Sequence, residues 1–526
     1  MATGNKKLIV SLLIAASVLF GAAGCSMSGI SPPAAPEASQ TDSPEVPETA
    51  TPAPEAEAPP EGVGLAYYTS SPLNPYQCDN TFNRLIGCLI YEGLFELTPE
   101  FEPVPRLCES YETSDNLSWK FTLKKDVRFS DGRLLTARDV AYSYGLASAA
   151  NSAFAPRFED VMSIVPADDE TVVITLKKAN VFFPRLLDIP VIPDGSGDEA
   201  APPGTGPYVF SEGAEGRSLV KNRYRPSPQG ADSIALIETK SQEQTLYDFQ
   251  TGRVNIVVYD RTRPGTVVYR GNSERARVGT TTMQYIGFNT DRFFTGETGV
   301  RAALSLGIDR KAIADNFFEG FADAAVLPVS PLSAAYDNEL ADSYAYEEGA
   351  MFSALYETGF RDTDGDGILE RYKTKFSLDF IVNNDNRNKV SAAQMIADTM
   401  REAGIDVTLR VLEWDDYMRA LNARNFDLYY GEINLKSDFD LRSLLYSYAP
   451  LNYGNYSNAT ADEMLSGYME GTVDAREFYT FLAQSAPIVP ILFKAEHVLY
   501  TRGLVKQMYA TSSNPFYRFS DWIFTD

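Results

Sequence analysis

The stretch SLDFIVNNDNRNKVSAAQMIADTMREAGIDVTLRV, residues 377–411, decides the fold class of this chain. Together with the residues that follow, it predicts a strand over 377–382, a helix over 389–403, a strand over 405–411, a helix over 415–423 and a strand over 426–433. This βαβαβ order is typical of an α/β lobe with a largely parallel sheet.

Local patterns within this stretch support the prediction. The predicted helix over 389–403 places four apolar residues on one face, namely Ala392, Met395, Ile396 and Met400. Gly404 is a natural C-terminal cap. Over 405–411 the apolar residues alternate with polar ones, at Ile405, Val407, Leu409 and Val411. That alternation predicts a strand with one buried face.

The first half of the chain contains more hairpin patterns and fewer helices. Trp119, Phe121 and Leu123 alternate with polar neighbours, and residues 171–176 give a further strand. Asp131-Gly132 predicts a turn, and Thr136 begins a capping-box pattern before a helix. A mixed α+β lobe therefore precedes the α/β lobe.

The chain begins with an export signal. Lys6 and Lys7 precede the uncharged run of residues 8–23, which as a helix spans only about 24 Å of a ~30 Å hydrocarbon core. This length predicts a secretory signal over 1–24. The small residues before Cys25 resemble the lipobox of bacterial lipoproteins, in which that cysteine is acylated. The alternative is an ordinary signal peptide with an incidental cysteine.

Residues 25–62 predict a lipidated cysteine followed by a disordered linker. From 26 to 62 there are nine prolines and seven acidic residues, with no Lys, Arg or aromatic residue. Such a segment cannot bury enough apolar surface to offset its ordering entropy. The net charge of −25 and the pI near 4.6 argue against nucleic acid as a partner and against electrostatic binding to anionic lipid.

The counts of cysteine and histidine exclude several mechanisms. Cys78, Cys88 and Cys108 have no CxxC spacing, which excludes a zinc ribbon and a disulfide framework, although one pair could be oxidised outside the cell. The single histidine, His497, lies in an apolar context that favours packing over catalysis. No GxSxG, HExxH, P-loop or GxGxxG motif occurs. These absences predict a protein that is not an enzyme and needs no cofactor.

Five motifs in order resemble one family. They are YEGLF (91–95), FSDGRLLTARDVAYS (129–143), PGTGPY (203–208), FNT (288–290), and VRAALS (300–305) followed by IDR (308–310). The chain resembles the family 5 extracellular solute-binding proteins of ABC transporters, the oligopeptide-, dipeptide- and nickel-binding type, in lipoprotein form. We expect the motifs themselves to be structural, with Gly204, Gly206 and Pro207 in a tight turn and Asn289 bonding its own turn.

The resemblance implies an α/β fold of the periplasmic-binding-protein type II, with two large lobes, a hinge and an additional small α+β lobe. It implies lobe I from residues 63–98, 202–292 and 496–526, a small lobe II at 99–201, and lobe III at 293–495. The two large lobes would close on a ligand that is not chemically transformed.

The resemblance also implies ligand residues. In peptide binders of this class an aspartate after the last strand of the third lobe pairs with the ligand's α-ammonium, and Asp438 aligns with it. The family's proline after this aspartate is missing, and Leu435 stands where an aromatic residue is common. The acids Glu432 and Asp440 lie close to Asp438 in sequence, with Lys436 and Arg442 beside them. The cluster is either a site for a cationic ligand or a salt-bridged loop. The aromatic candidates for ligand contact are Tyr67, Tyr68, Tyr430 and Trp414.

The DTDGDG sequence at 362–367 resembles the opening of a calcium loop. Asp362, Asp364 and Asp366 supply oxygens at positions one, three and five, but Lys373 stands where position twelve needs a bidentate Glu. An acidic turn common in the family is therefore favoured over a weak calcium site.

These observations predict a monomeric, lipid-anchored receptor on the outer face of the cell membrane, extracellular or periplasmic. Its expected partners are a peptide or other small polar ligand, ABC permease subunits, and the membrane through the acyl chain. The alternatives are a binder of a metal chelate or small polar solute, and a non-transporting surface sensor. A hydrolase with paired carboxylates is disfavoured by the absent motifs.

Overall fold

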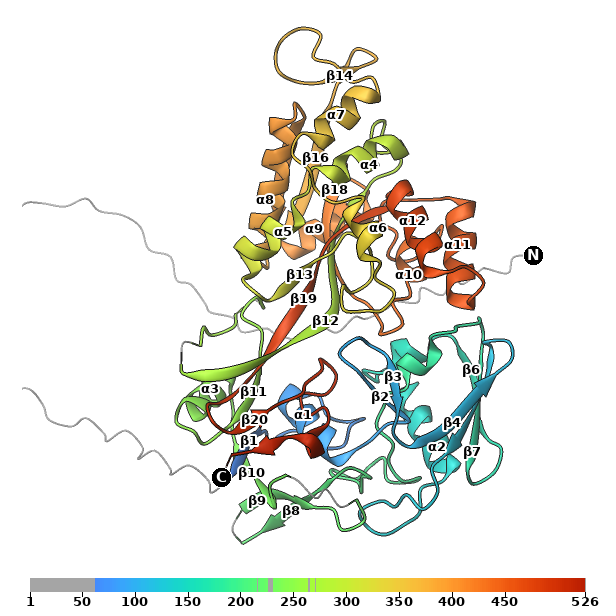
Figure 1. Cartoon of the computed structure of the whole chain (residues 1–526), viewed down its shortest axis with the longest axis vertical. Coiled ribbons are helices and arrows are strands. Elements are labelled where there is room, and N and C mark those ends of the chain that lie inside the picture. Colours follow the sequence, from blue (N-terminus) through green and yellow to red (C-terminus); the bar gives the residue numbers. More distant parts are fainter. Residues whose placement is uncertain (1–61, 215, 226–229, 264, 270, 526) are drawn as a thin grey trace, which may run out of the picture. The chain divides into compact units, whose positions relative to one another are not determined.

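The structure is a computed structural model that describes residues 62–214, 216–225, 230–263, 265–269 and 271–525 (Figure 1). The predicted signal sequence, Cys25 and the linker up to residue 61 lie outside the described residues. No helix in the described ranges combines the length and apolarity needed to cross a membrane.

The predicted βαβαβ unit is present, with its ends shifted by one or two residues. Its elements are β16 (Ser377–Asn383), α8 (Arg387–Glu402), β17 (Asp406–Leu412), α9 (Trp414–Asn422) and β18 (Leu428–Asn434). β16 pairs in parallel with both β17 and β18. The Asn386 side chain accepts from the backbone N–H groups that begin α8, and Gly404 follows the helix with a φ of +84°.

The complete sheet is mixed, whereas the sequence predicted a largely parallel one. β12 (Ser273–Phe288) and β19 (Ile488–Thr501) pair antiparallel, and β12 also pairs antiparallel with β18. The strand order is β11 (Ile256–Tyr259), β19, β12, β18, β16, β17, with β13 (Ala322–Ala324) on β19. Parallel pairing holds only inside the βαβαβ unit, because β12 and β19 enter the sheet from distant parts of the chain.

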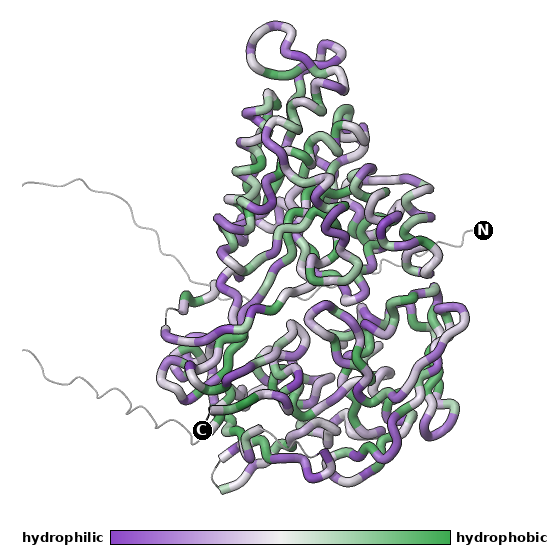
Figure 2. The backbone as a smooth tube through the Cα atoms, viewed as in Figure 1, coloured by the Kyte–Doolittle hydropathy of each residue, from purple (hydrophilic) through white to green (hydrophobic). Residues whose placement is uncertain are grey.

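The expected buried face of β17 is shorter than predicted. Ile405 and Val407 are buried and Leu409 is half-buried, but Val411 is 46% exposed. β17 is the edge strand of the sheet, so its far end has a neighbouring strand on one side only. In Figure 2 hydrophobic segments run mainly along the strands and inner helix faces, and hydrophilic segments lie mainly in outer loops.

A second sheet, antiparallel and four-stranded, matches the hairpin-rich pattern of the first half. Its order is β4 (Cys108–Thr113), β5 (Ser118–Leu123), β7 (Thr171–Leu176), β6 (Val161–Pro166). Trp119, Phe121 and Leu123 are all buried on one face of β5, as predicted. Helix α2 (Ala137–Ala147) begins at Thr136, whose backbone N–H donates to Asp139 at 2.7 Å in a capping box.

A third sheet has the order β1 (Val63–Tyr67), β10 (Ser233–Glu238), β9 (Gly216–Lys221), β8 (Tyr208–Gly213). Helix α1 (Thr81–Ile90) packs on β1 and β8. Gly204 and Gly206 lie against the end of α1, and a Cβ on Gly204 would lie 1.9 Å from the Ile90 carbonyl oxygen. Neither glycine has a positive φ, so close backbone approach explains them better than the predicted turn geometry.

Asn289 bonds its own turn, as expected, through a 3.1 Å bond from the Asp291 backbone N–H to its side-chain oxygen. Its side-chain nitrogen also donates to the carbonyls of Arg424 and Phe426. The FNT motif therefore fastens the end of β12 to the start of β18.

The remaining elements surround these sheets. The helices are α3 (Gln242–Gln250), α4 (Thr298–Leu306), α5 (Arg310–Ile313), α6 (Asn338–Asp342), α7 (Ala350–Glu357), α10 (Arg442–Leu445), α11 (Ala459–Glu470) and α12 (Ala475–Ser485). The short strand pairs are β2 (Phe95–Leu97) with β3 (Pro103–Pro105), β14 (Glu370–Arg371) with β15 (Thr374–Lys375), and β20 (Val505–Gln507) with β21 (Ile523–Phe524). Single turns of 3-10 or π-helix lie at Ala155–Phe158, Phe183–Leu186, Ala314–Phe318 and Phe519–Asp521.

Candidate ligand-binding site

The pairing of β12 with β19 is irregular at two places, between Gly279 and Met283 and between Gln284 and Tyr285, and the first leaves more residues out of the ladder. The register shifts between Gly279 and Met283, so the three threonines between them leave the regular ladder. Thr280 instead donates its hydroxyl to the Lys494 carbonyl at 2.8 Å. An irregularity in two long paired strands is a natural place for bending. The register shift between Gly279 and Met283 lies about ten residues before the predicted lobe boundary at 292. The lobe boundaries themselves stay predictions.

A polar cavity of about 270 Å³ lies beside this break. We call it the β12–β19 cavity, and it is lined by Asp260, Arg263, Thr280, Thr282, Asp385, Asn386, Lys389, Glu432, Asn434, Lys494 and Glu496. Its residues from β18 and from the segment after β16 lie at the carboxyl ends of parallel strands, where open α/β sheets bind ligands.

Most charges in the β12–β19 cavity are already paired. Lys494 donates to Asp260 at 2.9 Å in a buried ion pair, and Arg263 donates to Glu496 at 2.6 Å. Lys389 lies 3.2 Å from Asp385. Arg263 also lies 3.6 Å from Asp260, so each of the three cations has at least one acid partner, and the fourth acid of the cavity, Glu432, is left over.

Glu432 is the predicted site residue that the structure places in this cavity. Among the described residues it forms no ion pair, and its carboxylate accepts one hydrogen bond, from Gln284 at 2.6 Å. Gln284 in turn accepts from the Tyr430 hydroxyl at 2.8 Å. An exposed carboxylate beside paired charges can receive an ammonium or another hydrogen-bond donor from a ligand.

Tyr430 was predicted as a ligand contact, but it is fully buried in the core of the sheet. In this conformation its role is to orient Gln284, which holds Glu432. The physical reason is that β18 is covered on both faces at this point, since the neighbouring Tyr429, on the opposite face, is buried as well.

Asp438 and Asp440 lie in the loop after β18 and do not line the β12–β19 cavity. Asp438 is 1% exposed and accepts from the Asn180 side chain at 2.9 Å. No Lys or Arg of the described ranges forms an ion pair with it. Burial raises the pKa of its carboxyl, and the nearby Lys436 offsets part of that rise.

Asp440 is held by cations of its own loop. Arg442 donates to it at 2.8 Å and also, at 2.8 Å, to Asp160, which directly precedes β6 of the β4–β5–β7–β6 sheet (the small sheet). Lys436 lies 3.4 Å from Asp440. Burial alone would raise the pKa of Asp440, but the bonds from Arg442 and the charge of Lys436 lower it to about 2. The salt-bridged loop, one of the two predicted alternatives, therefore describes Asp440.

The loop after β18 also joins two distant parts of the chain. The bonds from Asn180 to Asp438 and from Arg442 to Asp160 tie it to the region of the small sheet. The Val181 backbone N–H donates to the Met469 carbonyl at 2.8 Å in the same region. A ligand could reach Asp438 only after Asn180 moves away from it.

The other aromatic candidates lie apart from the β12–β19 cavity lining. Tyr67 is buried on β1 under the Arg217 guanidinium, and burial raises the pKa of its phenol. Tyr68 is half-buried and stacks on Phe82 with ring centroids 5.3 Å apart. Trp414 is the first residue of α9 and is 54% exposed. Their roles stay predictions.

The DTDGDG turn gathers its acids as a calcium loop would. The carboxylates of Asp362, Asp364 and Asp366 lie within 4.8 Å of one another and are exposed. Lys375 forms ion pairs with Asp364 and Asp366, and Asp362 accepts from backbone N–H groups of the turn. A lysine and backbone N–H groups therefore already hold these acids, which fits the predicted acidic turn.

The cysteines and the histidine are packing residues. Cys78, Cys88 and Cys108 are free thiols, so the predicted possibility of an oxidised pair does not apply to this structure. His497 is buried against the Phe321 ring, with centroids 4.2 Å apart. Burial, with Arg275 and Arg277 nearby, lowers its pKa to about 4, so it is neutral at physiological pH.

Sequence reasoning missed the residues that line the cavity together with Glu432, above all Asp260, Asn386 and Lys494. Asn386 donates to the Thr262 carbonyl at 2.9 Å in a buried bond across 124 residues of sequence. Asn386 could have been found, because it follows a predicted parallel strand just as Asp438 does. Asp260 and Lys494 carry no comparable local signal.

The family model of the bacterial extracellular solute-binding proteins, family 5 Middle, matches residues 102–455. This is more than half of the chain, and the protein belongs to that family. The family consists of extracellular or periplasmic solute-binding proteins of ABC transporters, and they are transport proteins, not enzymes.

Curated relatives cover most of the chain at low identity. The oligopeptide-binding protein AppA of Bacillus subtilis is 24% identical over 449 residues, covering 79% of this chain and 83% of its own. The periplasmic murein peptide-binding protein MppA of Escherichia coli is 24% identical over 458 residues, which cover 76% of this chain and 82% of its own. The nickel-binding periplasmic protein of E. coli is 24% identical over 361 residues, 64% and 68%.

Solved structures share the fold. A nickel ABC transporter protein from Bacillus halodurans superposes with a TM-score of 0.69 at 18% identity, covering 86% of this chain and 96% of its own. The B. subtilis AppA structure in complex with a nonapeptide gives a TM-score of 0.55 at 22% identity, covering 88% of this chain and 98% of its own. The predicted α/β fold of the periplasmic-binding-protein type is therefore confirmed.

Proposed function

We propose that this protein is a lipid-anchored receptor that captures a peptide-like ligand between two lobes and delivers it to an ABC permease for import. Family membership supports solute binding as such. The peptide relatives support the ligand class, because AppA and MppA carry oligopeptide- and murein peptide-binding names.

The observation that carries the proposal is the pair of acids without a cation. Glu432 is the one acid of the β12–β19 cavity that no described Lys or Arg neutralises, and Asp438 is buried with an amide as its side-chain partner. Asp438 is desolvated, which is unfavourable for a carboxylate unless a positive group reaches it, whereas the exposed Glu432 is accessible to a ligand's positive group. A peptide's α-ammonium supplies that charge and three donors.

Closure around the ligand would use the break in β12. The segments on the two sides of the break pair with different strands, β19 alone up to Gly279 and both β18 and β19 from Met283. The bond from Asn386 to the Thr262 carbonyl bridges the same region. Contacts that form only in the closed arrangement would bias the equilibrium toward closure when ligand is bound.

The test is a thermal-shift screen of short peptides with free amino termini, each paired with its Nα-acetylated form. We expect a peptide to raise the Tm of the wild type and its acetylated form to raise it much less. Asp438→Asn should abolish the shift by the free peptide, whereas Glu463→Gln, an exposed glutamate of α11, should leave it unchanged. Equal shifts for wild type and Asp438→Asn would place the ammonium elsewhere.

A second candidate ligand is a small polar solute or metal chelate. The β12–β19 cavity, at about 270 Å³, is slightly smaller than the usual ligand site of roughly 300–1,000 Å³, which favours a small ligand. The nickel-binding relatives belong to the same fold. Mass spectrometry of the molecule that co-purifies separates the two candidates. A permease gene beside this one favours transport over the sensor alternative.

Anchoring rests on Cys25 and is tested apart from ligand binding. The Cys25→Ser variant should lose incorporation of labelled fatty acid and leave the membrane fraction. Retention of both properties in this variant would refute the proposed anchor and leave the proposed ligand site untouched.

A further inference from the structure

A second and larger cavity, of about 720 Å³, lies beside helix α1. We call it the α1 cavity. Its walls come from α1, from β2, from residues 154–157 and 188–190, and from the C-terminal segment 513–521. It shares no lining residue with the β12–β19 cavity. Its volume falls in the usual range for sites that enclose a small molecule.

The walls of the α1 cavity are largely apolar and aromatic. Rings and aliphatic side chains that line it include Leu73, Tyr91, Phe95, Phe154, Phe516 and Phe519. Phe516 and Phe519 pack edge to face with centroids 5.9 Å apart. Such a surface binds apolar groups by removing them from water. The β12–β19 cavity, in contrast, is lined almost entirely by polar and charged side chains.

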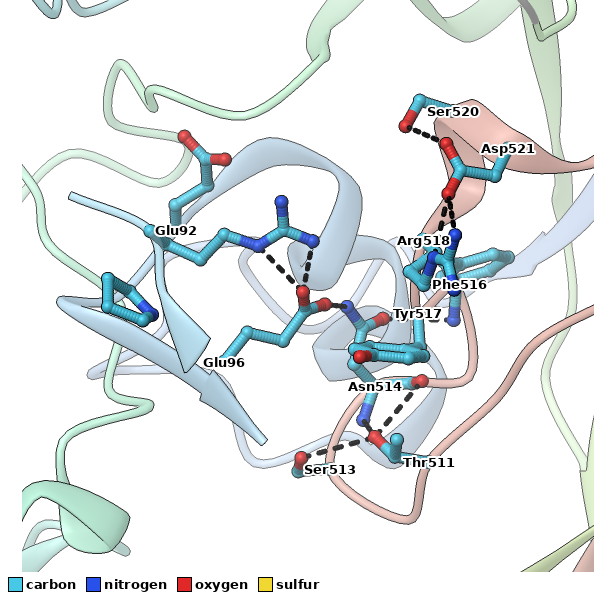
Figure 3. A network of polar contacts seen from close by, with 12 residues as sticks. Glu92, Glu96, Thr511, Ser513, Asn514, Phe516, Tyr517, Arg518, Ser520 and Asp521 are labelled. Atoms are coloured by element: carbon cyan, nitrogen blue, oxygen red, sulfur yellow. Dashed lines mark hydrogen bonds and ion pairs between the residues drawn. The ribbon is translucent and has the colours of Figure 1, made fainter. Parts of the chain in front are cut away.

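The acids of the α1 cavity are each matched by an arginine. Glu96 accepts from the Arg106 side chain at 2.6 Å. It also accepts from the Asn514 side chain at 2.7 Å, and Figure 3 shows this second bond. The other three pairs are Glu92 with Arg225, Asp188 with Arg157, and Asp521 with Arg518. These four pairs carry no net charge.

One arginine remains after this pairing. Arg84 lines the cavity from α1, is exposed, and forms no ion pair with any residue of the described ranges. The cavity therefore has an excess of one positive charge, placed where solvent and ligand can reach it. An anionic group is the complement of that charge.

Two further polar atoms among the lining residues lack partners. In the described part of the chain, the buried Tyr91 hydroxyl and the Glu92 Oε2 atom have no hydrogen bond. The second oxygen of Glu92, Oε1, accepts from Arg225 at 2.8 Å. Figure 3 shows the Glu92 carboxylate turned away from the Glu96 pair. Buried polar groups in native proteins normally have partners, so these two atoms suggest that a bound molecule completes the site.

We propose that the α1 cavity is a second ligand site, for a small and mostly apolar or aromatic molecule that carries one anionic group and one hydrogen-bond donor. Arg84 binds the anionic group, the aromatic walls bind the apolar body, and the donor serves Glu92. The site is separate from the proposed peptide site, which calls for a cationic group.

The probe for this proposal is 8-anilinonaphthalene-1-sulfonate, which has an aromatic body, one sulfonate and one N–H donor. Its fluorescence on titration with the protein without the predicted signal sequence should show one saturable site. Cys88→Trp fills the cavity from α1 and should abolish that site. Arg84→Gln should weaken it by about fivefold, as for a single exposed charge. Arg138→Gln, an exposed arginine of α2, is the matched control and should change nothing.

The outcomes are distinct from those of the peptide experiment. Asp438→Asn and Glu432→Gln should bind the probe as the wild type does. No saturable site in the wild type, or unchanged binding by both Cys88→Trp and Arg84→Gln, would overturn the proposal. Unchanged thermal unfolding of Arg84→Gln keeps its result interpretable if Cys88→Trp fails to fold.

Discussion

The loop after β18 and the β12–β19 cavity both contain acidic residues, but these acids have different roles in the two regions. In the loop, Asp440 forms an ion pair with Arg442 and lies near Lys436, so its charge is already neutralised within the protein. In the cavity, three acids have cations and Glu432 has only an amide. Acids that lie within nine residues in the sequence therefore separate in space into structural and available ones. The partners of a charge, more than its position, indicate which acids can meet a ligand.

Removing the charge of Asp440 should give the largest effect on stability. Asp440→Asn leaves the buried Arg442 with only Asp160 as an acid partner, and we expect a loss of about 3 kcal/mol in the free energy of unfolding. Denaturant unfolding measures it. The matched variant Asp160→Asn removes the half-buried partner and should cost less, about 1 kcal/mol. Equal costs would show that the two acids are not distinguished by burial.

Lowering the pH should reduce the stability of the protein through His497, which lies on the strand β19 that carries two cavity residues. His497 lies on β19 three residues after Lys494, and its pKa is lowered from 6.5 to about 4. As the pH falls, the histidine of the unfolded chain takes up a proton before that of the folded protein does. The contribution of His497 to stability is therefore complete above pH 6.5 and is lost as the pH drops toward 4. Tm measured across this window should fall less in His497→Phe than in the wild type. Parallel curves would contradict the buried neutral histidine.

Shortening Tyr430 should sharpen the comparison with a smaller effect. Tyr430→Phe removes the bond to Gln284 that orients Glu432, at a cost of about 1 kcal/mol in stability. Because Glu432 loses its orientation and keeps its charge, ligand affinity should fall only about threefold by calorimetry. A loss as large as that of Glu432→Gln would mean that Tyr430 contacts the ligand after all.

Local signals were sufficient for much of the fold. The alternation around Trp119, the cap at Thr136 and the order of elements over 377–433 all depend on neighbours in sequence, and each is present. Gly204 was predicted to matter, but its reason, the approach of the Ile90 carbonyl, is a contact across more than one hundred residues. Sequence patterns do not contain such contacts.

The candidate site was only partly predictable for the same reason. Glu432 was singled out from its position at the end of a strand, and it lies in the β12–β19 cavity. Asp260, directly after β11, and Lys494, in the middle of β19, are its neighbours there and lie 234 positions apart in the sequence. The burial of Tyr430 depends on core packing that covers both faces of β18 at this point, and the sequence of the strand does not show that packing.

The most direct test of the account is the affinity of one ligand for two charge-removing variants. A peptide that stabilises the wild type, or the molecule that co-purifies with it, is titrated by calorimetry into the wild type, Glu432→Gln and Asp440→Asn. We expect Glu432→Gln to keep the wild-type Tm and lose at least tenfold in affinity, and Asp440→Asn to lose Tm and keep the affinity. The reverse pattern, with affinity lost in Asp440→Asn and kept in Glu432→Gln, would contradict the division into structural and available acids.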